Sequence, residues 1–452
     1  MSSLRPWAIL SFLLLSGPIA AEQQPIARED WIIAAEPNTP NYWGIEWGYT
    51  TGTLPQRTIV RADHELENRY FDNFRFEGRN LFLRFLGMGL RGATYSFDNQ
   101  FTTDQINIQH VYGHDAFARM ATGENDTFPP VADRFSQILP KFLGGSELNS
   151  GNDTISERPT NAANNTADYD MMMNMQPEEA LNEFAYRNGK QILGGDTVNT
   201  WQLMSYIAYK RQYQRVEGIE SGPLVACSTC GATDFQAWAA DLNSRRYGAT
   251  DISQYRVTMD DVHRAYNYQL LDPIFWESVF MYAKDWIVLG KNETHMPMIP
   301  LGENVSYLPS LRAYFTPFGV DYFQDNYFRV KGALVNAYWT RGDDKWQKRS
   351  GVGVDIDNLR VGPVTFGLFG ARFVQPPIDL TRVAPVTDLG ALHVVSKVGG
   401  WIKAPIWRRN DGSSDPSTLF LYTRLCLKNY GWMPGEYLFG RTSTELGLGL
   451  HF

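Results

Sequence analysis

Two histidines four residues apart carry the clearest chemical signal in the sequence. His110 and His114 lie in the stretch HVYGH, inside a segment from Thr102 to about Ala121 whose pattern predicts a helix. Side chains at positions i and i+4 project from one face of a helix, with their Cβ atoms about 5 to 6 Å apart. Two imidazoles placed in this way can bind one zinc ion together. The spacing therefore predicts a metal site, with zinc as the expected metal.

The HVYGH stretch resembles the H-E-x-x-H helix of zinc metallopeptidases, and Gly113 matches the glycine of their H-E-x-G-H form. Val111 occupies the position of the glutamate that takes a proton from the metal-bound water in those enzymes. Because valine cannot accept a proton, the resemblance implies a vestigial or atypical zinc hydrolase and supplies no catalytic residue. Two histidines that only pack against other side chains are the alternative. The sequence thus leaves open whether the chain is an enzyme.

A complete zinc site needs a third protein ligand, which would come from another helix. Glu179 and Glu183 are candidates because they are four residues apart in one expected helix, and His263 lies in another. Asp115 points away from the face of the two histidines, so we expect it to orient a ligand rather than to bind the metal. Acidic residues at a helix start also complement the helix dipole, which is the alternative for the two glutamates.

Cys227 and Cys230 form a C-x-x-C sequence, and the third cysteine is Cys426. A redox site would require a βαβ context and a zinc site a second C-x-x-C, and the sequence has neither. In an exported protein the pair is expected to form a local disulfide in a glycine-flanked loop. Cys426 lies in a strand-like stretch and is expected to be unpaired.

The last nine residues alternate apolar side chains with small or polar ones, which predicts a strand. Its apolar face consists of Leu446, Leu448, Leu450 and Phe452. The pattern resembles the C-terminal insertion signal of bacterial outer-membrane β-barrels, in which the last strand ends in Phe. The same alternation recurs at 392–403 and 419–428, with charges confined to one face. The resemblance implies a place in the outer membrane of a Gram-negative cell, and a surface hairpin of a soluble sandwich is the alternative.

The start of the chain and its composition agree with export. Residues 1–21 have the pattern of a cleaved signal peptide, with a charge at Arg5, a short apolar core and small residues before Glu22. The apolar core is shorter than the roughly 20 residues of a membrane-spanning helix. Aromatic residues make up 14% of the chain, as in barrels with aromatic girdles. A net charge of −8 and a pI near 5.5 argue against a nucleic-acid surface.

The chain divides into four parts. After the signal at 1–21, residues 22–101 are expected to supply N-terminal barrel strands, and 305–452 the C-terminal strands. Between them, 102–304 have helical periodicity, with a polar loop at 122–168. The expected fold is mainly β with a large α insertion, namely a transmembrane antiparallel β-barrel of roughly 8–12 strands that carries a helical plug or periplasmic domain.

Individual elements can also be placed. Strands are expected at 307–316, 327–340, 350–361 and 363–374, in addition to the three already named. Helices are expected at 177–188, 200–214, 258–271 and 273–289. Thr258 and Asp261 form a capping-box pattern before the third of these helices, and Asp272 with Pro273 opens the fourth.

Three functions are compatible with these features. The first is an outer-membrane barrel whose helical domain binds a metal, with zinc as the cofactor. The second is a non-enzymatic channel, transport or assembly protein with a helical plug. The third is a soluble, secreted β-rich binding protein. For the first two, the expected partners are outer-membrane lipid and the barrel-assembly machinery, with no nucleic acid.

Overall fold

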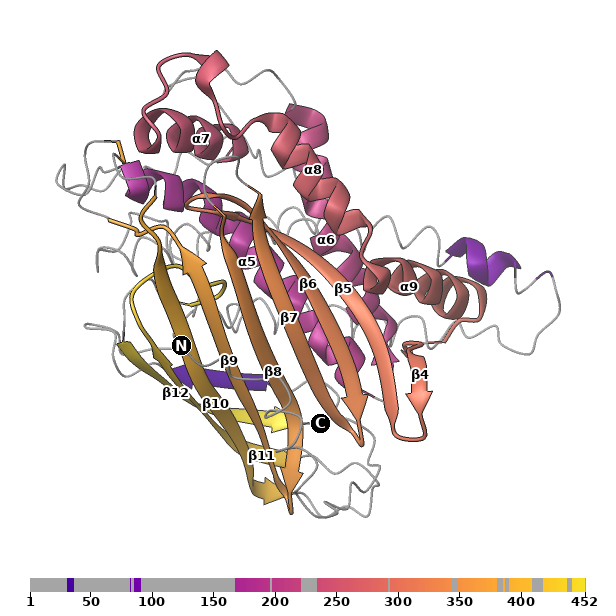
Figure 1. Ribbon diagram of the computed structural model, residues 1–452. Helices are drawn as coiled ribbons and strands as arrows, with labels where there is room; N and C mark the ends of the chain where they lie inside the picture. Colours follow the sequence, from indigo (N-terminus) through magenta and orange to yellow (C-terminus); the bar gives the residue numbers. More distant parts are fainter. Residues whose placement is uncertain are drawn as a thin grey trace, which may run out of the picture.

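The computed structural model describes residues 31–35, 82, 85–90, 167–195, 197–220, 234–291, 293–343, 348–379, 385–386, 390–408, 418–436 and 441–451 (Figure 1). This part of the chain contains a large antiparallel sheet and several helices. The sheet has the strand order β1-β12-β11-β10-β9-β8-β7-β6-β5-β4. Its members are β1 (Trp31–Ala35), β4 (Ile299–Gly302), β5 (Val305–Thr316), β6 (Gly319–Val330), β7 (Ala333–Asp343), β8 (Ser350–Val361), β9 (Val364–Gln375), β10 (His393–Arg408), β11 (Thr418–Lys428) and β12 (Arg441–His451).

Most of the expected strands are confirmed, but the one expected at 327–340 is wrong, and residues 85–90, within the region 22–101 that was expected to supply barrel strands, are helical. The chain reverses at Lys331 and Gly332, which have φ angles of 49° and 86°, so that β6 and β7 form a hairpin. Two successive residues with positive φ make the tight turn that suits the right-handed twist of paired strands. The apolar alternation continues through this turn, so alternation alone could not reveal it.

The described strands form an open sheet whose edges are β1 and β4. The antiparallel sheet is thus confirmed, whereas closure into a barrel is not observed within the described residues. One long-range pairing joins the two ends of the sequence, because β1 pairs with β12 from Trp31 opposite Leu450 to Ala35 opposite Leu446.

The helices are α5 (Ala167–Gly194), α6 (Thr200–Glu220), α7 (Asp234–Asp241), α8 (Met259–Leu270) and α9 (Pro273–Met281), with the π-helical turns η3 (Leu242–Arg246) and η5 (Tyr282–Val288) and the short 3-10 turn η4 (Ile252–Gln254). A two-residue ladder joins β2 (Val198–Asn199) to β3 (Glu293–Thr294). The expected starts of α8 and α9 are confirmed: Thr258 N donates to Asp261 Oδ2 at 2.8 Å, and Asp272 caps α9. The bounds expected for the helix at 177–188 are wrong, because α5 runs from Ala167 to Gly194. No helix in the described ranges is both long and apolar enough to cross a membrane.

Helix α5 runs along one face of the sheet and contacts β5, β6 and β7 (Figure 1). We call this face, which carries Arg312, Asp325 and Asp355, the inner face, and the opposite face, which carries Leu368 and Val398, the outer face. Two apolar cores join the helices to the sheet. The larger core contains Trp238, Phe315, Phe323 and Trp432. The second core contains Tyr206, Phe275 and Tyr327. The helices therefore fix which side chains of the inner face are covered.

Candidate functional site: a polar network between helix α5 and the sheet

Helix α5 presents a polar stripe to the sheet. Glu179, Glu183, Tyr186 and Lys190 follow one another at i, i+4, i+7 and i+11, which places them on one side of an α-helix. Both glutamates are buried, and Tyr186 and Lys190 are half-buried. Burying charged groups costs free energy unless each finds a partner. The partners come from the inner face of the sheet.

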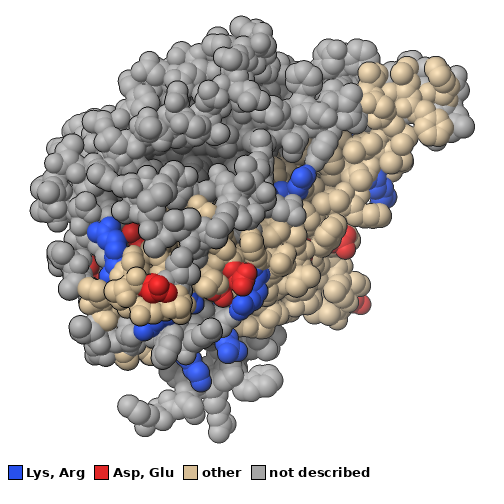
Figure 2. All heavy atoms as spheres, turned by 90° about the horizontal axis from the view of Figure 1, so that it is seen from above, with Lys and Arg blue, Asp and Glu red and all other residues tan. Residues whose placement is uncertain are grey.

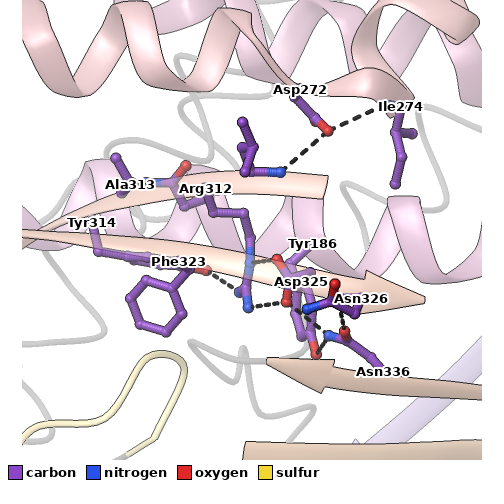
Figure 3. Close-up of polar contacts among 12 residues, drawn as sticks. Tyr186, Asp272, Ile274, Arg312, Ala313, Tyr314, Phe323, Asp325, Asn326 and Asn336 are labelled. Carbon is purple, nitrogen blue, oxygen red and sulfur yellow. Dashed lines mark hydrogen bonds and ion pairs between the residues drawn. The ribbon is translucent and has the colours of Figure 1, made fainter. Parts of the chain in front are cut away.

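Arg312 on β5 is the centre of these contacts (Figure 3). Its Nε and Nη2 atoms donate to the two carboxylate oxygens of Asp325 on β6, at 2.6 and 2.7 Å. Its Nη1 donates to the hydroxyl of Tyr314 at 2.9 Å, and that hydroxyl donates to Glu183 at 2.6 Å. The ring of Tyr186 covers the guanidinium at 3.8 Å. Arginine is suited to this position because its planar fork binds a carboxylate at two points and stacks on aromatic rings.

Lys190 closes the other end of the stripe. Its Nζ lies 2.6 Å from Asp357 and 3.2 Å from Asp355, both on β8. Asp355 also accepts a hydrogen bond from Tyr186 at 2.5 Å. Asn336 on β7 joins the two halves, since its Nδ2 lies 3.0 Å from the Tyr186 hydroxyl and 2.8 Å from Asp325. The network thus ties one helix to four neighbouring strands.

Glu179, at the start of the polar stripe, holds the loop 429–436 between β11 and β12 against the inner face. Glu179 accepts hydrogen bonds from the indole of Trp432 at 2.9 Å and from the backbone of Gly435 at 3.0 Å. Gly435 has a φ of +68°, and a Cβ atom on it would lie 2.7 Å from Glu183 Oε2. Only glycine fits here, because both the backbone angle and the space exclude a side chain.

Glu436 ends this loop in an ionic cluster on the inner face. Its Oε1 lies 2.6 Å from Arg424 on β11 and 3.0 Å from Lys397 on β10. Burial alone would raise the pKa of Glu436, but the two cations overcome this effect and lower the pKa to about 2. The carboxylate therefore stays charged at any physiological pH, which suits a structural tie more than an acid catalyst.

A second polar cluster covers the edge of β5. Asp272 accepts a hydrogen bond from the backbone of Leu311 at 3.3 Å and lies 3.2 Å from Lys210. Lys210 in turn donates to the carbonyl of Leu311 at 2.7 Å. The carbonyl of Ala313 accepts from Asn182 and Gln269. Helix side chains thus occupy the hydrogen-bonding positions that another strand would fill.

Several residues predicted from the sequence lie outside the described part of the chain, so their arrangement stays a prediction. They are His110, His114, Asp115, Cys227, Cys230 and Phe452. Leu446, Leu448 and Leu450 lie in β12, and the side chain of Leu446 is exposed. Cys426 is a free, buried cysteine, as expected.

The three candidate third ligands of the metal site are in the described part. Glu179 and Glu183 hold the protein donors named above, and half-buried His263 lies on α8. Within the described ranges, no three His, Cys, Asp or Glu side chains are placed to hold a metal ion. Glu179 and Glu183 contact the loop and the sheet, and the metal site stays a prediction because His110 and His114 lie outside the described residues.

The members of the network on the strands were not predicted. Arg312 is the single charge of β5, whereas Asp325 and Asp355 share β6 and β8 with other charged residues, so the available signal is weak. Such charges normally face water or find a partner, but the partner follows only from the strand register.

No protein-family model, curated protein or solved structure matches this chain.

Proposed function

We propose that this chain is a bacterial outer-membrane protein whose sheet crosses the bilayer as the wall of a β-barrel, with α5 as a plug inside it. One observation carries the proposal: the outer face is apolar and exposed, whereas the inner face is charged and covered. Exposed apolar side chains of the outer face are Trp339, Val352, Leu368, Val394, Val398, Ile402, Leu421, Leu425, Leu427 and Leu446. Charged groups of the inner face are Arg312, Asp325, Asp355, Lys397 and Arg424.

The inner face combines these charged groups with buried apolar side chains such as Phe323 and Phe373, whereas the outer face is apolar although it is exposed, which is unusual for a sheet in water. Lipid explains it, because strands of a membrane barrel turn apolar side chains outward and polar ones inward. The eight strands from β5 to β12 have 11 to 16 residues each, and about 9 to 11 suffice to cross a bilayer. At β5, helix side chains seal the edge of the wall.

The experiment is to place a charge on the outer face and compare it with a charge in water. Val398→Arg is expected to destabilise the folded protein in vesicles by about 2–4 kcal/mol, the cost of an arginine near the middle of a bilayer. Glu303→Arg, at an exposed position in the turn between β4 and β5, is the matched control and is expected to have little effect. The wild type should need detergent for extraction and should migrate differently on a gel before and after boiling. Recovery as a soluble protein, with both variants equally stable, would refute the proposal.

The polar stripe supports a closed channel over an open pore. The ion pairs of Glu183 with Arg312 on β5 and of Lys190 with Asp357 on β8 hold α5 along the inner face, where a solute would otherwise pass. We therefore infer a low conductance in planar bilayers, which rises when the ties of α5 are removed.

A further inference from the structure

Helix α9 and the π-helical turn η5 expose one side and bury the other. Phe275, Met281 and Trp286 face the protein core. On the opposite side, Trp276 is 57% and Phe280 is 60% exposed, although both are large and apolar. Other exposed positions of this stretch are Leu271, Ala283, Lys284, Val288 and Leu289. We call the exposed side the aromatic helix face.

Polar groups on this face are few and are satisfied at its margin. The indole nitrogen of Trp276 donates to the carbonyl of Leu270 at 2.7 Å, so the exposed ring offers no unpaired donor. Lys284 lies 5.9 Å from the ring of Phe280 and 3.9 Å from the carboxylate of Asp285. Aromatic rings beside a lysine with a long apolar stem are typical of helices that lie in the interface of a bilayer.

The aromatic helix face is continuous with the outer face of the sheet. Helix α9 contacts β5, whose neighbour β4 exposes Ile299 and Leu301. Ile299 lies opposite Tyr307 on β5, and successive strand pairs continue this row to Leu368 on β9, which is exposed on the outer face. Figure 2 shows that the right-hand end of the molecule, where Figure 1 places α9, presents mainly uncharged atoms.

We infer that α9 and η5 lie in the interfacial layer of the bilayer, with Trp276 and Phe280 inserted among the lipid chains and Lys284 at headgroup level. This inference rests on the proposed membrane location of the sheet. Lipid, rather than a second copy of the chain, is the occupant that the continuity with the outer face favours. The helix would anchor the side of the sheet at which β5 is not paired with a further long strand.

The test uses an environment-sensitive fluorophore, NBD, on single cysteines in a full-length background with Cys227→Ser, Cys230→Ser and Cys426→Ala. Phe280→Cys reports the helix face, Val398→Cys the outer face, and Glu303→Cys the aqueous control. The proteins are inserted in phosphatidylcholine vesicles with bromine near the headgroup or deep in the chains. We expect the label at position 280 to be quenched about twofold by shallow bromine and less by deep bromine, since interfacial helices insert about 5–10 Å.

The outcomes separate the two proposals. If the label at 398 is quenched while that at 280 behaves like the one at 303, the sheet is in lipid and the inference about α9 is wrong. If neither is quenched, the membrane proposal itself fails. A blue-shifted label at 280 that bromine does not quench, and whose shift disappears on dilution, would assign this face to a second copy of the chain and overturn the inference.

Discussion

Arg312 and Asp325 form a two-point ion pair on neighbouring strands, closed over by the ring of Tyr186 from α5. Both partners of the pair are buried. Arg312 therefore contacts both the neighbouring strand and helix α5. The positions of the sheet and the helix depend on each other through this one guanidinium.

Removing the guanidinium should destabilise the protein strongly. Arg312→Met leaves the carboxylate of Asp325 buried without its cation, for which we expect a loss of about 3–5 kcal/mol in the free energy of unfolding. Arg312→Met combined with Asp325→Leu should lose less than Arg312→Met alone, because no unpaired charge remains. Urea titration in vesicles, followed by tryptophan fluorescence, measures both. Lys331→Met, in an exposed turn, is the control. Strictly additive effects of Arg312→Met and Asp325→Leu on the free energy of unfolding would contradict the coupling of these two residues.

Lys190 should control whether α5 stays in place. Lys190→Met leaves Asp355 and Asp357 facing each other without the ammonium that lies between them. Repulsion between the two carboxylates should loosen α5, raise the conductance in planar bilayers and expose the helix to protease. Lys190→Arg keeps the charge and should resemble the wild type. Equal conductance in all three proteins would show that α5 is not a plug.

Acid should weaken the cluster at Glu436. Its pKa in the folded protein is about 2, against an ordinary value of 4.5. A lowered carboxylate pKa stabilises the fold above the ordinary value, and this stabilisation is lost as the pH falls towards the folded value. The difference corresponds to about 3 kcal/mol. The free energy of unfolding of the wild type should fall by this amount between pH 6 and pH 2. The Glu436→Gln variant should be less stable than the wild type at pH 6, and its stability should change less over this pH range.

Asp272 should protect the edge of β5. Asp272→Ala removes the acceptor for the backbone of Leu311, the cap of α9 and the partner of Lys210. We expect a loss of about 3–5 kcal/mol from the unpaired lysine and association of the variant through the uncovered edge. Native gels and size-exclusion chromatography detect the association. Glu303→Ala, which removes an exposed carboxylate in the turn between β4 and β5, should leave both stability and association unchanged.

The histidine motif predicts bound zinc independently of the described residues. The purified wild type should contain zinc, and the double variant His110→Ala with His114→Ala should lose it. Comparison of His263→Ala with Glu183→Gln would show which candidate completes the site. Absence of zinc from the wild type, or equal zinc in the double variant, would rule out a metal site at these histidines.

Elements with a local signal were predictable. Alternation placed β8, β9, β10 and β11 and assigned the faces of β10 and β11, because period two is a property of the strand itself. Asp272 and Pro273 placed the start of α9 for a similar local reason. Helix α5 shows the limit: Pro177 suggested a start, because proline is costly inside a helix, yet the helix begins at Ala167 and buries Met175 before the proline.

The network was not predictable because its partners are far apart in sequence. Glu183 and Tyr314 are separated by 131 positions, and Tyr186 and Asp355 by 169. Their contact depends on how α5 lies across the sheet, which no pattern along the chain encodes. Glu179 and Glu183 illustrate the consequence: their spacing fits a metal, and the same spacing also fits the loop and strand that they contact.

The pairing of β1 with β12 also constrains the order of assembly. Residues 31–35 find their partner only at 446–450, so this contact has nearly the longest sequence separation that the chain allows. Contacts of this kind form late, because closing a loop of such length costs entropy before any hydrogen bond is gained. Until β12 has been made, β1 therefore lacks this partner strand and is prone to aggregate. We expect the chain to fold with less aggregation when a chaperone that binds unpaired strands is present until the last strand arrives.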